Sequence, residues 1–146
     1  MSVVRRFVLM AAALSIALLG AACSSSSGTS GGPIENRDWL LRAYADSSGA
    51  MKDAYVTVPL NARFQGGTIK GAAGCSQYTA SYAIGEDHLA ISDLQVGTEI
   101  CDSYAIEGRD TFMAAFRRVS IFKVDGTRLT LYDKDGTEVL RFAEKP

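Results

Sequence analysis

The fold class is decided by one stretch of the sequence, YTASYAI at positions 78–84, in which the larger apolar side chains recur at every second position. Positions 78, 80, 82 and 84 of a strand point to one face, and the residues between them point to the other. A strand with this period packs one face on a core and leaves the other to solvent. The stretch therefore predicts a half-buried β-strand.

Similar short runs lie on both sides of this stretch and predict a mainly β chain. Most have the same period of two and are bounded by turn residues. Asp125-Gly126 and Asp135-Gly136 separate the last three runs, and Asp-Gly supplies the positive φ angles of tight hairpins, so these runs should form a meander. The predicted strands cover positions 39–45, 55–64, 68–70, 78–84, 88–94, 121–124, 128–132 and 139–142.

One segment, positions 103–118, has a helical period instead. Ile106, Met113 and Phe116, with Phe112 beside them, approximate the i, i+3, i+4, i+7 spacing of an amphipathic helix. Many short strands with a single helix predict a mainly β fold of the α+β class. We expect a strongly curved antiparallel sheet or partial barrel whose core packs against that helix.

The N-terminal residues have the order of a bacterial signal peptide. A basic start at positions 1–6 precedes an apolar run at positions 7–19, and small residues then lead to Cys23. The apolar run falls short of the ~20 residues that span a bilayer, which disfavours a transmembrane helix. The cleavage region resembles a bacterial lipobox, although Gly20 stands where leucine is usual. The resemblance implies cleavage before Cys23 and acyl chains on it, which would anchor the protein to a membrane.

The tract SSSSGTSGG at positions 24–32 predicts a flexible tether, because Ser and Gly have little apolar surface to bury. The chain thus divides into a signal peptide at 1–22, a lipidated cysteine with its tether at 23–33, and one folded domain at 34–146. It carries 15 basic and 16 acidic residues, and removal of two arginines with the signal peptide changes the formal charge from -1 to -3. This balance argues against a nucleic-acid partner.

With Cys23 assigned to lipid, two of the three cysteines remain, Cys75 and Cys101. Export leads to an oxidising compartment, which favours a disulfide between them. Such a bridge would close a loop of ~27 residues and contribute roughly 3 kcal/mol in the chain-entropy model. The alternative is a pair of free thiols that are buried as small apolar groups. Both interpretations stay open at the level of the sequence.

His88 is the only histidine, and it follows Gly85-Glu86-Asp87 in a predicted hairpin turn. A catalytic histidine needs a nucleophile and an orienting acid nearby, and the sequence has no nucleophile elbow. A transition-metal site would also have too few ligands, because one histidine and two candidate disulfide cysteines do not complete one. The sequence therefore predicts no enzyme activity, no metal and no cofactor.

Tyr78 and Tyr82 lie on the same face of the predicted strand 78–84 and have two interpretations. They could stack on a bound ligand, or they could fill the core of a small β domain. Apolar strand faces normally point inward, so we expect both rings to pack in the core.

The stretch GAAGCSQYTASY at positions 71–82 resembles the META domain, the family of HslJ-like heat-shock lipoproteins. The family pattern there is G-x-x-G-C-N-x-Y-x-G-x-Y, and this chain has Ser76 for the asparagine and Ala80 for the later glycine. The resemblance begins at Trp39-Leu40 and continues to the final hairpin. The residues that match or occupy its motif positions are Gly74, Cys75, Ser76, Tyr78, Tyr82, Thr98 and Cys101.

The resemblance implies a lipocalin-like partial barrel with one helix, in a family associated with stress responses and without an established catalytic residue. We therefore expect a non-enzymatic lipoprotein of the cell envelope, attached to a bacterial membrane through Cys23, that binds a small molecule or a protein partner. One alternative is a purely structural, stress-protective protein. Another is a hydrolase, which would need His88 in a pocket beside a hydroxyl nucleophile.

Overall fold

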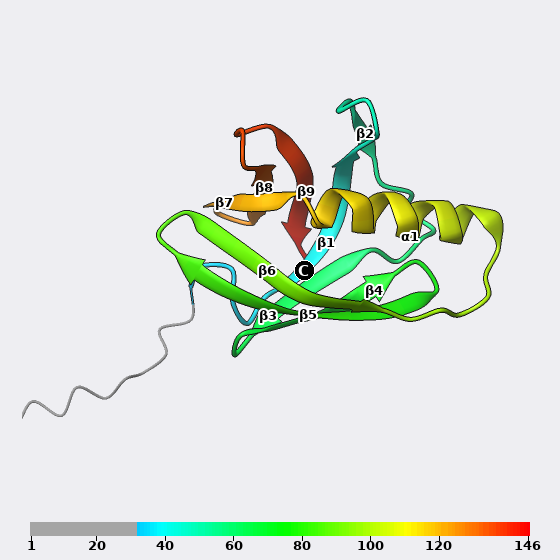
Figure 1. Cartoon of the computed structure of the whole chain (residues 1–146), viewed down its shortest axis with the longest axis horizontal. Coiled ribbons are helices and arrows are strands. Elements are labelled where there is room, and N and C mark those ends of the chain that lie inside the picture. Colours follow the sequence, from blue (N-terminus) through cyan, green and yellow to red (C-terminus); the bar gives the residue numbers. More distant parts are fainter. Residues whose placement is uncertain (1–31) are drawn as a thin grey trace, which may run out of the picture.

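The computed structural model describes residues 32–146, which form an eight-stranded antiparallel barrel, one additional short strand and one helix (Figure 1). The spatial order of the strands is β2-β1-β3-β4-β5-β6-β7-β8-β9, and β1 also pairs with β9. The elements in chain order are β1 (Asp38–Ala45), β2 (Met51–Asp53), β3 (Asn61–Gln65), β4 (Thr68–Ala73), β5 (Ser76–Gly85), β6 (His88–Val96), α1 (Ser103–Phe116), β7 (Val119–Asp125), β8 (Arg128–Asp133) and β9 (Glu138–Glu144).

The predicted signal peptide, Cys23 and most of the predicted tether lie outside the described residues. Within residues 32–146, no helix is both long enough and apolar enough to cross a membrane.

β5 confirms the alternation predicted at positions 78–84. Its residues are buried and exposed in turn from Ser76 to Ala83, and Tyr78, Ala80 and Tyr82 all face the core. The hairpins predicted at the two Asp-Gly pairs are also present, because β7, β8 and β9 follow one another as an antiparallel meander. The mainly β fold with one helix is therefore confirmed.

The predicted strand at positions 55–64 is wrong in its first half, because β3 begins only at Asn61. Val56 is 96% exposed and has no apolar surface to cover, so its β propensity is not used. Pro59 has no N–H group to donate to a strand ladder. The unpredicted strand β2 precedes this loop and pairs with the end of β1. Its three residues are too few to show a period.

The ring of strands closes, although the sequence predicted only a curved sheet or a partial barrel. β1 and β9 pair from Trp39 opposite Glu144 to Tyr44 opposite Leu140. The least extensive seam joins β6 to β7, where the register contains one pair, His88 with Ile121. Closure removes the free sheet edges that an open sheet of the same strands would present to other chains.

The helix α1 covers one end of the barrel, where it packs against β1, β4 and β9. Asp102 caps its start, since the carboxylate accepts a 2.9 Å hydrogen bond from the N–H of Ala105. Phe112, Met113 and Phe116 form its buried face. The predicted helix at positions 103–118 is therefore confirmed to within two residues.

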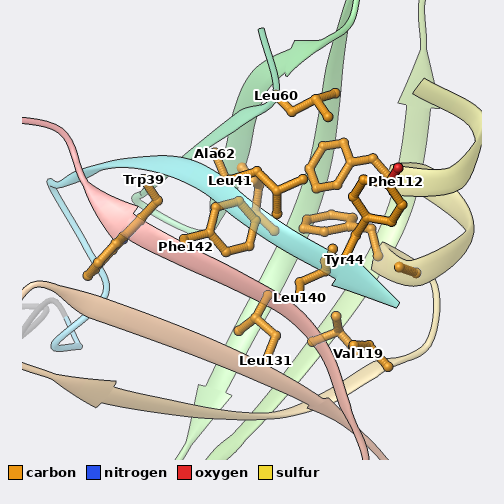
Figure 2. Close-up of a cluster of buried hydrophobic side chains, with 14 of the residues drawn as sticks. Trp39, Leu41, Tyr44, Leu60, Ala62, Phe112, Val119, Leu131, Leu140 and Phe142 are labelled. Atoms are coloured by element: carbon orange, nitrogen blue, oxygen red, sulfur yellow. The ribbon is translucent and has the colours of Figure 1, made fainter. Parts of the chain in front are cut away.

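Two ends of the barrel can now be defined. The entry end contains Ile34, where the described chain joins the barrel, and Trp39, whose ring is completely buried. The helix end contains α1, the turn between β4 and β5, and the loop at positions 54–60. Figure 2 shows the core that connects them, with Trp39 at one side and Phe112 of α1 at the other. Full burial of one large apolar side chain contributes roughly 1.5–3 kcal/mol to the stability of the fold.

Candidate functional site

Two glycines of the family motif allow close packing at the helix end. Gly74 lies in the turn between β4 and β5 with a φ of 68°, and a Cβ there would come 2.6 Å from the carbonyl oxygen of Ala105 in α1. Only glycine readily allows both the positive φ and this close approach. At Gly71 a Cβ would come 2.8 Å from the ring of Tyr78. Both motif positions therefore require glycine for packing.

The two motif cysteines lie close together in the same region. Cys75 and Cys101 lie at disulfide distance, with 6.2 Å between their Cα atoms and a sequence separation of 26. The pair connects the β4–β5 turn to the residues that precede α1. Of the two interpretations that the sequence left open, this geometry matches the disulfide.

Ser76 is completely buried beside this staple. Its hydroxyl makes no hydrogen bond of normal geometry, although it lies close to the carboxylate of Glu99. Asparagine, which the family pattern has here, would offer a carbonyl and an amide for hydrogen bonding, whereas serine offers one hydroxyl. The substitution therefore leaves one hydroxyl at this buried position, and the carboxylate of Glu99 is its polar neighbour.

Tyr78 lies at the centre of the core at the helix end. Its ring contacts the rings of Phe112 and Phe116 edge to face, with centroid distances of 5.7 and 5.5 Å. Its O–H donates a 2.8 Å hydrogen bond to the backbone carbonyl of Asn61. Burial raises the pKa of this phenol far above its usual value. The ring is thus a packing element that is closed to solvent.

Tyr82 has the same kind of role nearer the entry end. Its ring packs edge to face on Phe64 at 5.3 Å, and its O–H donates a hydrogen bond to the carboxylate of Glu35. Burial, followed by this hydrogen bond, raises the pKa of Tyr82 to about 12. The structure places both motif tyrosines in the core, as we expected from the strand period.

A hollow beside the motif residues is the candidate binding site, and we call it the helix groove. It lies between α1 and the segment that leads from β6 to α1, and its volume is about 460 Å³. Val96, Ile100 and Ile106 supply apolar surface to it. Among the motif residues, Thr98 lines this groove.

Charged side chains surround the apolar part of the helix groove. Arg109, whose side chain is only 19% exposed, donates a 2.8 Å hydrogen bond from Nε to Asp110. The pKa of Glu99 is lowered, chiefly by a hydrogen bond from its own backbone N–H, then by the hydroxyl of Ser76, and least by the positive charge of Arg109. Arg117, at the C-terminal cap of α1, adds a second guanidinium. An apolar hollow with a few convergent polar groups is the usual form of a small-molecule site.

The sequence analysis singled out Thr98 but missed the helix side of this groove. Ile106, Arg109, Met113 and Arg117 recur at intervals of three and four, and such residues lie along one side of a helix. This spacing was the available signal. It was hidden because Met113 also fits the apolar face of the predicted helix, which we expected to pack on the core.

His88 lies far from any catalytic arrangement of the kind that a hydrolase would need. It is the first residue of β6, its side chain is 72% exposed, and its Nε2 lies 3.6 Å from the carboxylate of Asp87. It lines neither the helix groove nor the hollows that flank the loop at positions 54–60. The hydrolase alternative required His88 in a pocket, so the exposed position contradicts it.

The described part of the chain contains no group of three or more His, Cys, Asp or Glu side chains placed to hold a metal ion. Asp133, which begins the acidic turn after β8, instead accepts backbone hydrogen bonds from Asp135 and Thr137 at 3.0 and 2.9 Å. Its carboxylate therefore stabilises the hairpin between β8 and β9.

Several solved structures are similar to this chain. The NMR structure of a protein from Burkholderia xenovorans has a TM-score of 0.65 and 17% identity, over 77% of this chain and 83% of that one. The crystal structure of a DUF4847 family protein from Bacteroides vulgatus has a TM-score of 0.53 and 15% identity, over 75% and 93% of the two chains. At this identity the likeness concerns the fold alone. No curated protein matches the chain.

A comparison with family models gives a match over the whole of the described structure. The model described as the META domain matches residues 32–146.

Proposed function

The chain belongs to the META domain family, and on that premise we propose that it is a lipid-anchored protein of the bacterial cell envelope that acts by binding rather than by catalysis. The helix groove is the observation that supports binding most directly. It joins apolar surface from β6 and α1 to the charges of Arg109 and Glu99 within one hollow.

The groove suits a small molecule with an apolar part and a polar group. Val96, Ile100 and Ile106 would cover the apolar part and exclude water from it. Arg109 and Arg117 would bind an acceptor, and Glu99 would accept from a donor. The motif residues would act indirectly, because the cysteine pair and Gly74 position the two elements that form the groove.

The proposed location is supported by the N-terminal sequence and by the cysteines. The basic and apolar order before Cys23 is typical of an exported lipoprotein. Cys75 and Cys101 at disulfide distance suit an oxidising compartment such as the bacterial periplasm. A domain that carries lipid on Cys23 would be attached to the membrane through the Ser/Gly tract at positions 24–32.

One mass-spectrometric experiment tests both parts of this proposal. The full-length gene is expressed in a bacterial host, the protein is purified from membranes, and intact and native spectra are recorded after mixing with an envelope extract. We expect acyl chains on Cys23 and a retained small molecule. Ile106→Glu, which puts a charge in the helix groove, should lower retention by about tenfold, whereas Ala83→Glu on the exposed face of β5 should not.

An unmodified soluble product would contradict the anchoring. Two results together would contradict the binding role. The wild-type protein would show no adduct, and Ile106→Glu would rescue a deletion strain as well as the wild type does. That second result would favour the structural, stress-protective alternative.

A further inference from the structure

A second surface at the helix end exposes aromatic and apolar side chains, and we call it the aromatic patch. It consists of Tyr55 and Val56 from the loop at positions 54–60 and Tyr104 from the first turn of α1. These side chains are 42%, 96% and 65% exposed. The two tyrosine rings meet edge to face with a centroid distance of 6.5 Å. An exposed cluster of this kind marks a contact site more often than isolated apolar residues do.

The aromatic patch adjoins two hollows, because Tyr55 and Val56 line one of them and Tyr104 lines the other. On one side, the loop and the strand β1 form a hollow of about 550 Å³ that includes Arg42 and Asp53. On the other side, Val58, Asp102 and Tyr104 contribute to a hollow of about 400 Å³. An extended segment that crosses the patch could place successive side chains in both hollows, because neighbouring side chains of an extended chain point in opposite directions.

The charges around the aromatic patch are mostly negative. Asp53 and Asp102 line the two hollows, and Glu107 follows Tyr104 at the i+3 position, which places both on one side of α1. Two positive charges also lie here, because Arg42 lines one hollow and Lys52, which is opposite Tyr44 in β2, precedes Asp53. Aromatic faces attract cations, and nearby carboxylates strengthen the attraction.

The phenol of Tyr44 adjoins Tyr55. Its pKa is raised first by burial and then by Tyr55, Glu107 and Asp46, whose carboxylate is paired with Lys52. The carboxylates of Asp53 and Glu107 beside the two exposed rings make the aromatic patch complementary to a positive charge.

The position of the aromatic patch argues against a second contact with the anchoring membrane. β5 starts beside the patch at Ser76 and ends near the entry end at Ile84, whose side chain lies against Gly32. Its ten residues span about 30 Å. The patch and the attachment point thus lie at opposite ends of the barrel. In addition, the carboxylates would be repelled by anionic lipid headgroups.

We propose that the aromatic patch binds a positively charged, extended peptide segment of another protein, with a Lys or Arg side chain held over the rings of Tyr55 and Tyr104. Apolar neighbours of that cation would cover Val56 and enter the flanking hollows. This inference deepens the proposed binding role but does not depend on the helix groove.

Binding of labelled peptides to the full-length protein in nanodiscs tests this inference. One fluorescent peptide alternates arginine with leucine, and a matched peptide has glutamate in place of arginine. Only the arginine peptide should bind. Tyr104→Leu, which keeps apolar area but removes the ring, should weaken binding by about fivefold, whereas Tyr104→Phe should retain it. Tyr104 is mostly exposed, and circular dichroism will establish that both variants fold.

Charge variants separate this surface from the rest of the molecule. Glu107→Gln should weaken binding by about twofold to threefold at low salt and have little effect at high salt. Glu86→Gln at the entry end is the matched control and should leave binding unchanged. At high salt, where the added carboxylate is screened, Ile106→Glu should also leave binding unchanged, so a failure of the helix-groove proposal would be distinguishable from a failure here.

Three outcomes would overturn the inference. The first is equal binding of the glutamate peptide. The second is attachment to empty anionic vesicles that depends on Tyr104. The third is a dimer of this chain in solution that Tyr104→Leu dissociates, which would assign the patch to a second copy.

Discussion

The two ends of the barrel are closed by different means. At the entry end, Trp39 fills the core and its Nε1 donates a 2.8 Å hydrogen bond to the carbonyl of Ile34. Arg37 lies over the indole at 4.2 Å and pairs with Glu144. At the helix end, closure depends on α1, which is not part of the sheet. Tyr104 of this helix stays exposed to solvent. The barrel is therefore sealed by local hydrogen bonds at one end and by a separate element that leaves contact surface at the other.

The largest loss of stability is expected from removing a core side chain at either end of the barrel. Trp39→Ala and Phe112→Ala should each lower the free energy of unfolding by about 3–5 kcal/mol, because both remove a completely buried aromatic ring. Urea unfolding followed by circular dichroism measures both. A loss below about 1 kcal/mol for Phe112→Ala would show that α1 is an appendage rather than the cover of the barrel.

A smaller effect is expected where α1 meets the β4–β5 turn. Gly74→Ala should cost about 2–4 kcal/mol, because alanine disfavours the φ of 68° and its Cβ would clash with the carbonyl of Ala105. Gly136→Ala is the matched control, since Gly136 has a φ of 79° but open space around it, and should cost about 1–2 kcal/mol. Thermal unfolding of both variants gives the difference. Equal losses of stability in the two variants would mean that the backbone at the helix end shifts enough to accommodate the extra methyl group.

The smallest effect concerns pH at the entry end. The hydrogen bond from Arg37 holds the pKa of Glu144 below 4.5, its value in an unfolded chain. A carboxylate with a lowered folded pKa stabilises the fold above pH 4.5, and this contribution is lost as the pH falls through the folded pKa. Glu144→Gln should therefore lower Tm slightly at pH 7 and lose less stability than the wild type below pH 4.5.

Melting curves between pH 7 and pH 3 measure this difference. Glu86→Gln in the exposed turn after β5 is the control and should follow the wild type. Parallel wild-type and Glu144→Gln profiles would mean that the ion pair with Arg37 adds nothing at the entry end.

Local periodicity predicted most strands and the helix, because each of these patterns depends on neighbours within one element. It failed at positions 55–60, where Tyr55 and Val56 have strand-forming side chains but no core to cover. Closure between β1 and β9 could not be predicted, since it depends on the curvature summed over the whole sheet. The helix groove was missed for a similar reason. The polar side chains of α1 lie beside the segment that leads from β6 to the helix, and only the tertiary fold brings the two together.

The pairing of β1 with β9 also sets the order in which the domain can fold. Leu41 is opposite Phe142, so the contact that completes the ring joins positions separated by almost the whole domain. Such non-local contacts make folding slow, because the entropy of a long loop is lost before the contact forms. A chain that leaves the ribosome from its N-terminus cannot close the barrel until β9 has emerged. The edge of β1 that β9 covers therefore stays unpaired until almost the whole domain has been synthesised.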